Sequence, residues 1–217
     1  MAIKPILFNA EMVRAILDGR KTCTRRRVRF LPGENPRWTG YIRNGLMLYN
    51  GRNEPCIIKS PYQPGDILYV RETWEHFDCC CCEGDEHGNC YQEPQQNVLN
   101  KSYGCYMYRA TDEIYGDARW HPSIHMPKEA ARIWLKVTGV RMERLQEITE
   151  VGIQKEGVEV DPKECAGKFD FISELFLLFQ RLWNSTIKKS DLDRYGWDAS
   201  PWVWVIEFER CEKPEGV

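Results

Sequence analysis

The chain has 217 residues and a mass of 25.5 kDa, and 42% of its residues are hydrophobic, which is enough for a buried core and excludes a disordered chain. Thirty basic residues against 32 acidic ones give a formal net charge of −2, which excludes a protein that binds nucleic acid through its net charge. The sequence lacks an apolar run of the about 18 residues that a transmembrane helix needs, and its first residues lack a secretory signal pattern. We therefore expect a globular, cytoplasmic protein without a membrane partner.

Ten cysteines are present, and five of them lie within the short segment Cys79–Cys90. A secreted disulfide framework would spread its cysteines along the chain. Their concentration in one segment instead predicts reduced thiols in a cytosolic protein, together with one metal site at most.

The first half of the chain predicts one helix followed by strands. Residues Asn9–Gly19 read as a short helix, because they begin with an asparagine N-cap and end in a glycine suited to the left-handed C′ position. Glycines and prolines in residues 31–60 indicate loops and short hairpin strands. The turn Gln63–Asp66 then leads into a strand over Ile67–Thr73.

The second half begins with residues 75–102, which are polar and without periodicity and therefore predict an inserted loop. Strands are predicted over Cys105–Ala110, Arg132–Val140 and Trp202–Glu209, and helices over Thr149–Gly157 and Asp170–Asn184. Because strands and helices do not alternate regularly, the order disfavours a doubly wound parallel sheet. We expect one α+β domain over residues 1–217: a small, mostly antiparallel β-barrel or curved sheet with helices packed outside and insertions at about 31–60 and 75–102.

A basic run follows the first helix, with six basic residues among the ten from Arg20 to Arg29. Such a cluster in a nearly neutral protein indicates a site for an anionic ligand, although a solvated loop gives the same pattern. In an extended segment Arg25 and Arg27 share one face and Arg26 lies on the other. We therefore expect Arg26 to contact the ligand directly and the other two to serve as phosphate contacts.

The spacing G-x-K-x-x-T-x-R within this run is formed by Gly19, Lys21, Thr24 and Arg26. With this motif the chain resembles the ASCH domains, small β-barrels of the PUA-like superfamily. Three further segments are similar to the family: Gln63–Asp66, Leu145–Gly157 and Trp204–Phe208. The chain resembles in particular the longer ASCH proteins of bacteriophages and prophages.

The resemblance extends to bacterial ASCH proteins that hydrolyse N4-acetylcytidine, and it implies a site made of Lys21, Thr24 and Glu156. Threonine would be the nucleophile, lysine its activating base, and glutamate would orient the substrate amine or shuttle a proton. In an extended segment Lys21 and Thr24 face opposite ways, so a pocket that uses both needs a turn or bulge. Glu150 competes with Glu156 because only local spacing sets the alignment.

Four other residues are candidates for substrate binding. Arg26 offers a planar fork for a carbonyl edge or a phosphate. Glu72 and Trp74 share a strand face and could hydrogen-bond and stack a nucleobase, or simply form a strand edge with a core tryptophan. His125, in a loop beside proline, could cover a pocket or hydrogen-bond the backbone.

The cysteine-rich segment contains a possible zinc site with the ligands Cys79, Cys82, His87 and Cys90, because a C-x2-C pair supplies two soft ligands from one tight turn. His76 could compete as a ligand. A cysteine-rich insertion without metal is the alternative.

Three functions follow from these patterns. The first is a binding module for a nucleoside, a nucleotide or single-stranded RNA. The second is an amidohydrolase of N4-acylated cytidine that uses the same site. The third is a phage protein that binds a host factor through an aromatic surface. Apart from zinc, no cofactor is expected.

Overall fold

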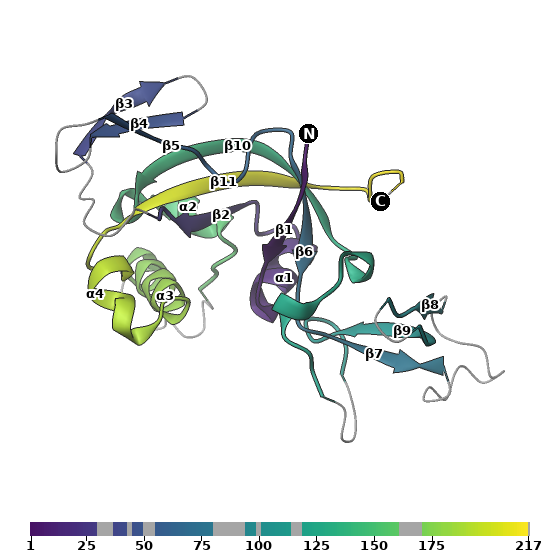
Figure 1. Ribbon diagram of the computed structural model, residues 1–217. Helices are drawn as coiled ribbons and strands as arrows, with labels where there is room; N and C mark the ends of the chain where they lie inside the picture. Colours follow the sequence, from purple (N-terminus) through teal and green to yellow (C-terminus); the bar gives the residue numbers. More distant parts are fainter. Residues whose placement is uncertain are drawn as a thin grey trace. The chain divides into compact units, whose positions relative to one another are not determined.

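The computed structural model describes residues 1–29, 37–42, 45–49, 55–79, 94–98, 101–113, 119–160 and 171–216. Its helices are α1 (Ala10–Leu17), α2 (Glu150–Lys155), α3 (Phe171–Ser185) and α4 (Leu192–Tyr195) (Figure 1). Its strands are β1 (Ile3–Leu7), β2 (Cys23–Arg27), β3 (Arg37–Ile42), β4 (Gly45–Tyr49), β5 (Pro55–Ile58), β6 (Ile67–Arg71), β7 (Trp74–Asp78), β8 (Gln95–Gln96), β9 (Tyr103–Tyr108), β10 (Trp134–Arg144) and β11 (Trp202–Cys211).

The described strands form three sheets, with the strand orders β1-β6-β10-β11-β2, β3-β4-β5 and β7-β9-β8. Most pairs are antiparallel, while β1 and β6 run parallel. The α+β class and the mostly antiparallel pairing are therefore confirmed. Within the described part of the chain these sheets are open, and no closed barrel is found.

The chain divides into two compact units that are each built from separate segments. The first unit comprises Met1–Arg20, Asp66–Lys136 and Glu209–Val217, and the second comprises Lys21–Gly65 and Val137–Phe208.

In the first unit, β1 pairs with β6 so that Ile6 lies opposite Val70, and both side chains are buried. Helix α1 begins where predicted, because the Asn9 side chain accepts a hydrogen bond from the backbone of Met12 at 2.9 Å. It ends at Leu17 with Asp18 as its C-cap, and Gly19 follows with a φ of +76°, the left-handed conformation that glycine adopts without strain.

The predicted loop over residues 75–102 is wrong at both of its described ends. Strand β7 begins at Trp74 and pairs with β9, so that His76 lies opposite Tyr106 and Asp78 lies opposite Gly104. The short strand β8 pairs with the beginning of β9. The side chains of β7 are mostly polar, so they lack the apolar–polar alternation that would identify a strand in the sequence. The segment is a strand because it pairs with β9, which lies further along the chain.

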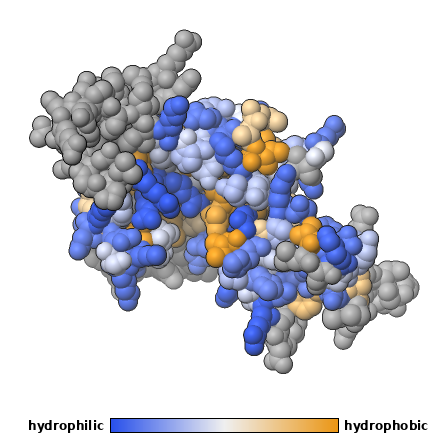
Figure 2. All heavy atoms as spheres, viewed as in Figure 1, coloured by the Kyte–Doolittle hydropathy of each residue, from blue (hydrophilic) through white to orange (hydrophobic). Residues whose placement is uncertain are grey.

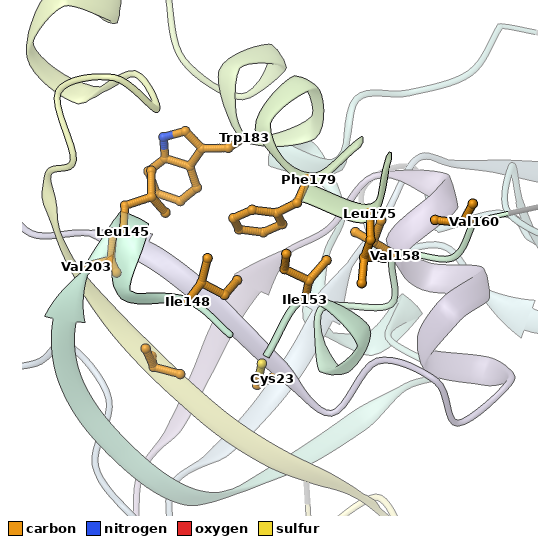
Figure 3. Close-up of a cluster of buried hydrophobic side chains, with 11 residues drawn as sticks. Cys23, Leu145, Ile148, Ile153, Val158, Val160, Leu175, Phe179, Trp183 and Val203 are labelled. Atoms are coloured by element: carbon orange, nitrogen blue, oxygen red, sulfur yellow. The ribbon is translucent and has the colours of Figure 1, made fainter. Parts of the chain in front are cut away.

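In the second unit, helices pack on one face of the pair formed by β2 and β11. Figure 3 shows Phe179 of α3 above Ile148 and Ile153, and Trp183 of the same helix next to Leu145; all of these side chains belong to one buried cluster. Val203 of β11 belongs to the same cluster. Full burial of each such side chain stabilises the fold by about 1.5–3 kcal/mol relative to exposure.

Strand β11 has two buried faces. The predicted apolar face, which includes Trp204 and Ile206, is buried, and so are Val203 and Val205 on the opposite face. The second face is buried because the α3 cluster covers it. Trp202, at the start of the strand, is only half-buried.

The surface seen in Figure 2 is mainly hydrophilic over the described residues, and its hydrophobic patches are small. Among the helices that the structure describes, none has the length and the apolar character needed to cross a membrane.

Candidate functional site

The residues of the candidate site come from β2, from Lys21 two positions before it, and from the C-terminal end of the short helix α2, all within the second unit. The helix begins at Thr149, whose hydroxyl accepts from the backbone of Gly152 at 3.2 Å, and it ends before Gly157, whose φ is +83°. Glu156 is the C-cap residue. The backbone N–H of Thr22 donates to the carbonyl of Lys155 at 2.9 Å, so the start of β2 is tied to the end of α2.

Lys21 and Glu156 form a buried ion pair. The Lys21 ammonium Nζ lies 2.6 Å from Glu156 Oε2 and also donates to the backbone carbonyl of Glu156 at 2.9 Å. The two side chains are only 1% and 6% exposed. The structure thus brings together two of the three residues that the resemblance assigned to a catalytic site, although they are 135 positions apart.

Arg25 binds the same carboxylate from the other side. Its Nη1 lies 3.1 Å from Glu156 Oε1, while its Nε and Nη2 donate to Glu143 Oε1 at 2.9 and 2.7 Å. Burial acts to lower the pKa of Arg25, but the two glutamates outweigh burial and raise that pKa above its ordinary value. Arg25 is therefore a fixed cation between two carboxylates, and it is not the exposed phosphate contact that the sequence suggested.

The ion pairs continue toward the surface. Glu143 Oε2 lies 3.3 Å from Arg141 Nε, and Arg141 Nη1 lies 2.6 Å from Glu207. Positive and negative side chains therefore alternate from Lys21 to Glu207. Because each charge in this series has an opposite neighbour, the buried members of the series are compensated.

Thr24 is buried, with 4% exposed, and it lies opposite Ile206 in the pairing of β2 with β11. Its neighbour Arg25 reaches Gly152 O on α2 at 3.5 Å. Since successive strand residues point to opposite faces, Thr24 points away from the face that carries the ion pairs. Within the described residues, no hydrogen bond joins the Thr24 hydroxyl to Lys21 or Glu156.

Arg26 shares the face of Thr24 on β2 and lies half-buried near Tyr62. Burial lowers the pKa of the Arg26 guanidinium, and interactions with Tyr62 and Glu156 oppose that change. Arg27, on the next position, is an ion-pair partner of Asp191 at 3.6 Å and stacks over the ring of Tyr195 at 4.7 Å. The basic run thus contains arginines with distinct surroundings.

Glu72, a candidate for base recognition, lies in the first unit and is 1% exposed. Its two carboxylate oxygens accept from Arg132 Nε and Nη2 at 2.9 and 3.0 Å. Arg132 also stacks over the Tyr108 ring at 4.0 Å. Both carboxylate oxygens of Glu72 are thus engaged by Arg132. A nucleobase that binds Glu72 would have to share this carboxylate with Arg132.

Trp74 and His125 also lie in the first unit. Trp74 is 2% exposed and packs in a buried cluster, with its ring centroid 5.7 Å from that of Tyr106. His121 stacks on the same indole at 5.1 Å. His125 is exposed in a short 3-10 turn.

Of the predicted zinc ligands, only Cys79 is described, and it is half-buried; Cys82, His87 and Cys90 lie outside the described residues. No group of three or more metal-ligating side chains is found within the described ranges. The predicted four-ligand site therefore stays a prediction.

Sequence reasoning missed Glu143 as a member of the ion-pair series, and it assigned Arg25 to a phosphate contact instead of to this series. Because side chains alternate along a strand, Arg25 must share the face of Cys23, and this is the face that contacts α2. The shared face of Arg25 and Cys23 could therefore have been predicted from the sequence. Glu143 comes from β10, more than one hundred positions away, and no local spacing indicates it.

Comparisons with models of known protein families, with curated proteins and with solved structures found no match for this chain. Its own residues therefore carry the functional argument.

Proposed function

We propose that the protein is an ASCH-like, PUA-like domain that binds a modified nucleoside or a nucleotide of single-stranded RNA against β2 and the end of α2. Lys21, Thr24, Arg26 and Glu156 are the proposed contacts, and because Thr24 and Arg26 lie on the face of β2 opposite the ion pair, the proposal requires this strand to turn when the ligand binds. The observation that carries the proposal is the buried ion pair between Lys21 and Glu156. A barrel-like closure of the sheet and a phage or prophage origin belong to the same proposal.

The binding function is favoured over catalysis by the state of the charged groups. Lys21 donates hydrogen bonds to two oxygens of Glu156, so its side-chain nitrogen is already engaged. Arg25 occupies the second oxygen of that carboxylate. A general base needs a free electron pair within hydrogen-bond reach of the nucleophile. Because Lys21 and Glu156 are both engaged in hydrogen bonds, they are better suited to binding a ligand than to removing a proton.

The second candidate function is an amidohydrolase of N4-acylated cytidine, and the same contact supports it. Proton transfer from Lys21 to Glu156 across 2.6 Å would free the lysine electron pair. The step requires β2 to turn so that the Thr24 hydroxyl faces Lys21, because the two side chains lie on opposite faces of the strand. Lys21 would then take the proton of that hydroxyl while the Thr24 oxygen attacks the acyl carbon, and the cytidine amine would leave with the proton returned by Lys21. Water would then cleave the acyl-threonine ester and release the carboxylic acid.

A panel experiment tests both functions. The reduced full-length protein is incubated with cytidine, N4-acetylcytidine, N4-propionylcytidine and N6-acetyladenosine, with chromatography for hydrolysis and calorimetry for binding. We expect binding of at least one acylated nucleoside. Loss of that binding in Lys21→Ala, but not in the matched control Lys155→Ala on the exposed side of α2, would support the site.

Equal binding by both lysine variants would place the ligand elsewhere. No binding of any nucleoside or of a short single-stranded RNA would refute the proposed function. Circular dichroism of each variant separates loss of a contact from loss of the fold.

A further inference from the structure

Two arginines stack on one tyrosine ring at the end of β2. Arg27 is the last residue of this strand, and its guanidinium carbon lies 4.7 Å from the centroid of the Tyr195 ring. The guanidinium carbon of Arg194, in α4, lies 5.0 Å from the same centroid. The ring therefore holds two cations from distant parts of the chain near each other, because an aromatic face attracts a cation through its quadrupole.

The backbone of Tyr195 is fixed to the core of the second unit. Its carbonyl oxygen accepts a hydrogen bond from the indole Nε1 of Trp183 at 2.8 Å, and Trp183 belongs to the buried cluster under α3. The next residue, Gly196, donates to the carbonyl of Leu192 at 2.7 Å and closes the turn of α4. The tyrosine is thus a stable support for both guanidiniums.

The hydrogen-bonding edges of these two guanidiniums are open. Arg25 and Arg132 donate to carboxylates inside the fold at 2.9 Å. Arg27 and Arg194, in contrast, make no hydrogen bond to any residue that the structure describes, and Asp191 comes only within 3.6 Å of Arg27. A guanidinium that is held by its flat face and keeps its N–H edge free can bind a phosphate through two parallel hydrogen bonds.

The charge around the ring is mainly positive. Lys188 and Lys189 are exposed directly before α4, and the ion pair of Asp191 with Arg27 brings this segment to the end of β2. From Lys188 to Arg194 the chain carries three basic and two acidic residues, and Arg27 adds a fourth cation. An excess of positive charge beside open guanidinium edges is complementary to a phosphodiester backbone.

We propose that Arg27, Tyr195 and Arg194 form a second subsite, which binds the phosphodiester backbone of single-stranded RNA. The inference rests on the proposed function, because it extends the site at Lys21 and Glu156 along β2. The six residues from Lys21 to Arg27 span about 20 Å when extended, which exceeds the length of a nucleoside but not that of an RNA strand. The substrate is then an RNA strand that contains the modified nucleoside, and the free nucleoside fills only part of the site.

The test compares two ligands on the reduced full-length protein: N4-acetylcytidine, and a short fluorescent single-stranded RNA that contains one N4-acetylcytidine. We expect Arg27→Ala and Arg194→Ala each to weaken RNA binding about fivefold, the effect of one hydrogen bond. Each should also lower the salt slope by about 0.7, the value for one phosphate contact on a single strand, and leave the affinity for the nucleoside unchanged. Tyr195→Leu should weaken RNA binding in the same way, whereas Tyr195→Phe keeps the ring and should bind RNA like the wild type.

Arg210→Ala is the matched control, because it removes the same charge from the exposed far end of β11. Val203 is the β11 partner of Arg27, so Arg210 lies seven residues further along this strand, about 23 Å away. Its RNA affinity and salt slope should equal those of the wild type.

Three outcomes would overturn the subsite. Unchanged RNA affinity and salt slope in both Arg27→Ala and Arg194→Ala would exclude it while leaving the nucleoside site intact. Binding of an acidic peptide as tightly as the RNA would assign this surface to a protein partner instead. Binding of neither the nucleoside nor the RNA by the wild type would refute the proposed function, and the subsite with it.

Discussion

The carboxylate of Glu156 lies between two cations, with Oε2 at 2.6 Å from Lys21 Nζ and Oε1 at 3.1 Å from Arg25 Nη1. All three side chains are buried, and they come from the start of β2 and from the end of α2. The same contacts that make this a candidate site also fasten the helix to the strand. Stability and ligand binding must therefore be measured separately in every variant of these residues.

Replacing Glu156 by alanine should destabilise the protein by about 3–5 kcal/mol, because two buried cations lose their shared counter-ion. Denaturant unfolding monitored by tryptophan fluorescence gives the value. The matched control is Glu150→Ala at the first turn of the same helix, where loss of a favourable interaction with the helix dipole costs about 1 kcal/mol or less. Similar losses in the two variants would contradict the burial and pairing of Glu156.

Arg25→Lys should destabilise the fold, whereas Arg27→Lys should have little effect. A lysine cannot reproduce the planar fork that reaches Glu143 and Glu156 together, so we expect a loss of roughly 2–3 kcal/mol on the scale of charged hydrogen bonds. Arg27 is 32% exposed and pairs with Asp191 at 3.6 Å, which predicts a change below about 1 kcal/mol. Thermal unfolding of both variants at matched salt checks the difference, and equal melting temperatures would count against it.

Thr24 distinguishes catalysis from binding at the proposed site. If the protein is an amidohydrolase, Thr24→Ser should retain part of the activity because a hydroxyl remains, and Thr24→Val should abolish it at nearly constant volume. If the site only binds, both variants should hold the ligand with losses of about 1 kcal/mol. Hydrolysis and calorimetric affinity for the same acylated nucleoside are the measurements. Full hydrolysis by Thr24→Val would exclude threonine as the nucleophile.

Gly104→Ala should prevent normal pairing of β7 with β9. A side-chain carbon there would lie 1.8 Å from the carbonyl oxygen of Phe77, a backbone atom that cannot move without breaking the strand pair. Gly19→Ala is the control, since nothing lies within 4 Å of the added carbon and only the left-handed backbone resists it, at about 1–2 kcal/mol. Hydrogen exchange of the amides in β9 should rise in the first variant alone.

Cys23 should resist alkylation in the folded protein. Burial and the nearby Glu156 carboxylate raise the pKa of its thiol to about 12, so at pH 8 about one molecule in ten thousand carries the reactive thiolate. Peptide mapping after iodoacetamide treatment should show Cys23 modified only under denaturing conditions, while the half-buried Cys211 reacts earlier. Rapid native labelling of Cys23 would mean that α2 opens readily from β2.

The sequence alone determined the elements whose signals lie within a few residues. Helix α1 begins after the N-cap Asn9 and is followed by Gly19. In the same way, α2 begins after the N-cap Thr149 and is followed by Gly157. A cap depends on hydrogen bonds between residues three or four positions apart, so the local order of residues is sufficient to specify it. The α+β class followed from the order of such elements.

Tertiary structure decided the partners of the charged and polar residues. Nothing near Glu72 in sequence indicates that Arg132, sixty positions later, takes both of its carboxylate oxygens, and β7 is a strand because β9 pairs with it. The resemblance placed Lys21 beside Glu156, but only the fold placed Arg25 and Glu143 around that carboxylate. A buried charge needs a counter-charge close in space, and spacing along the chain does not specify which distant residue the fold brings there.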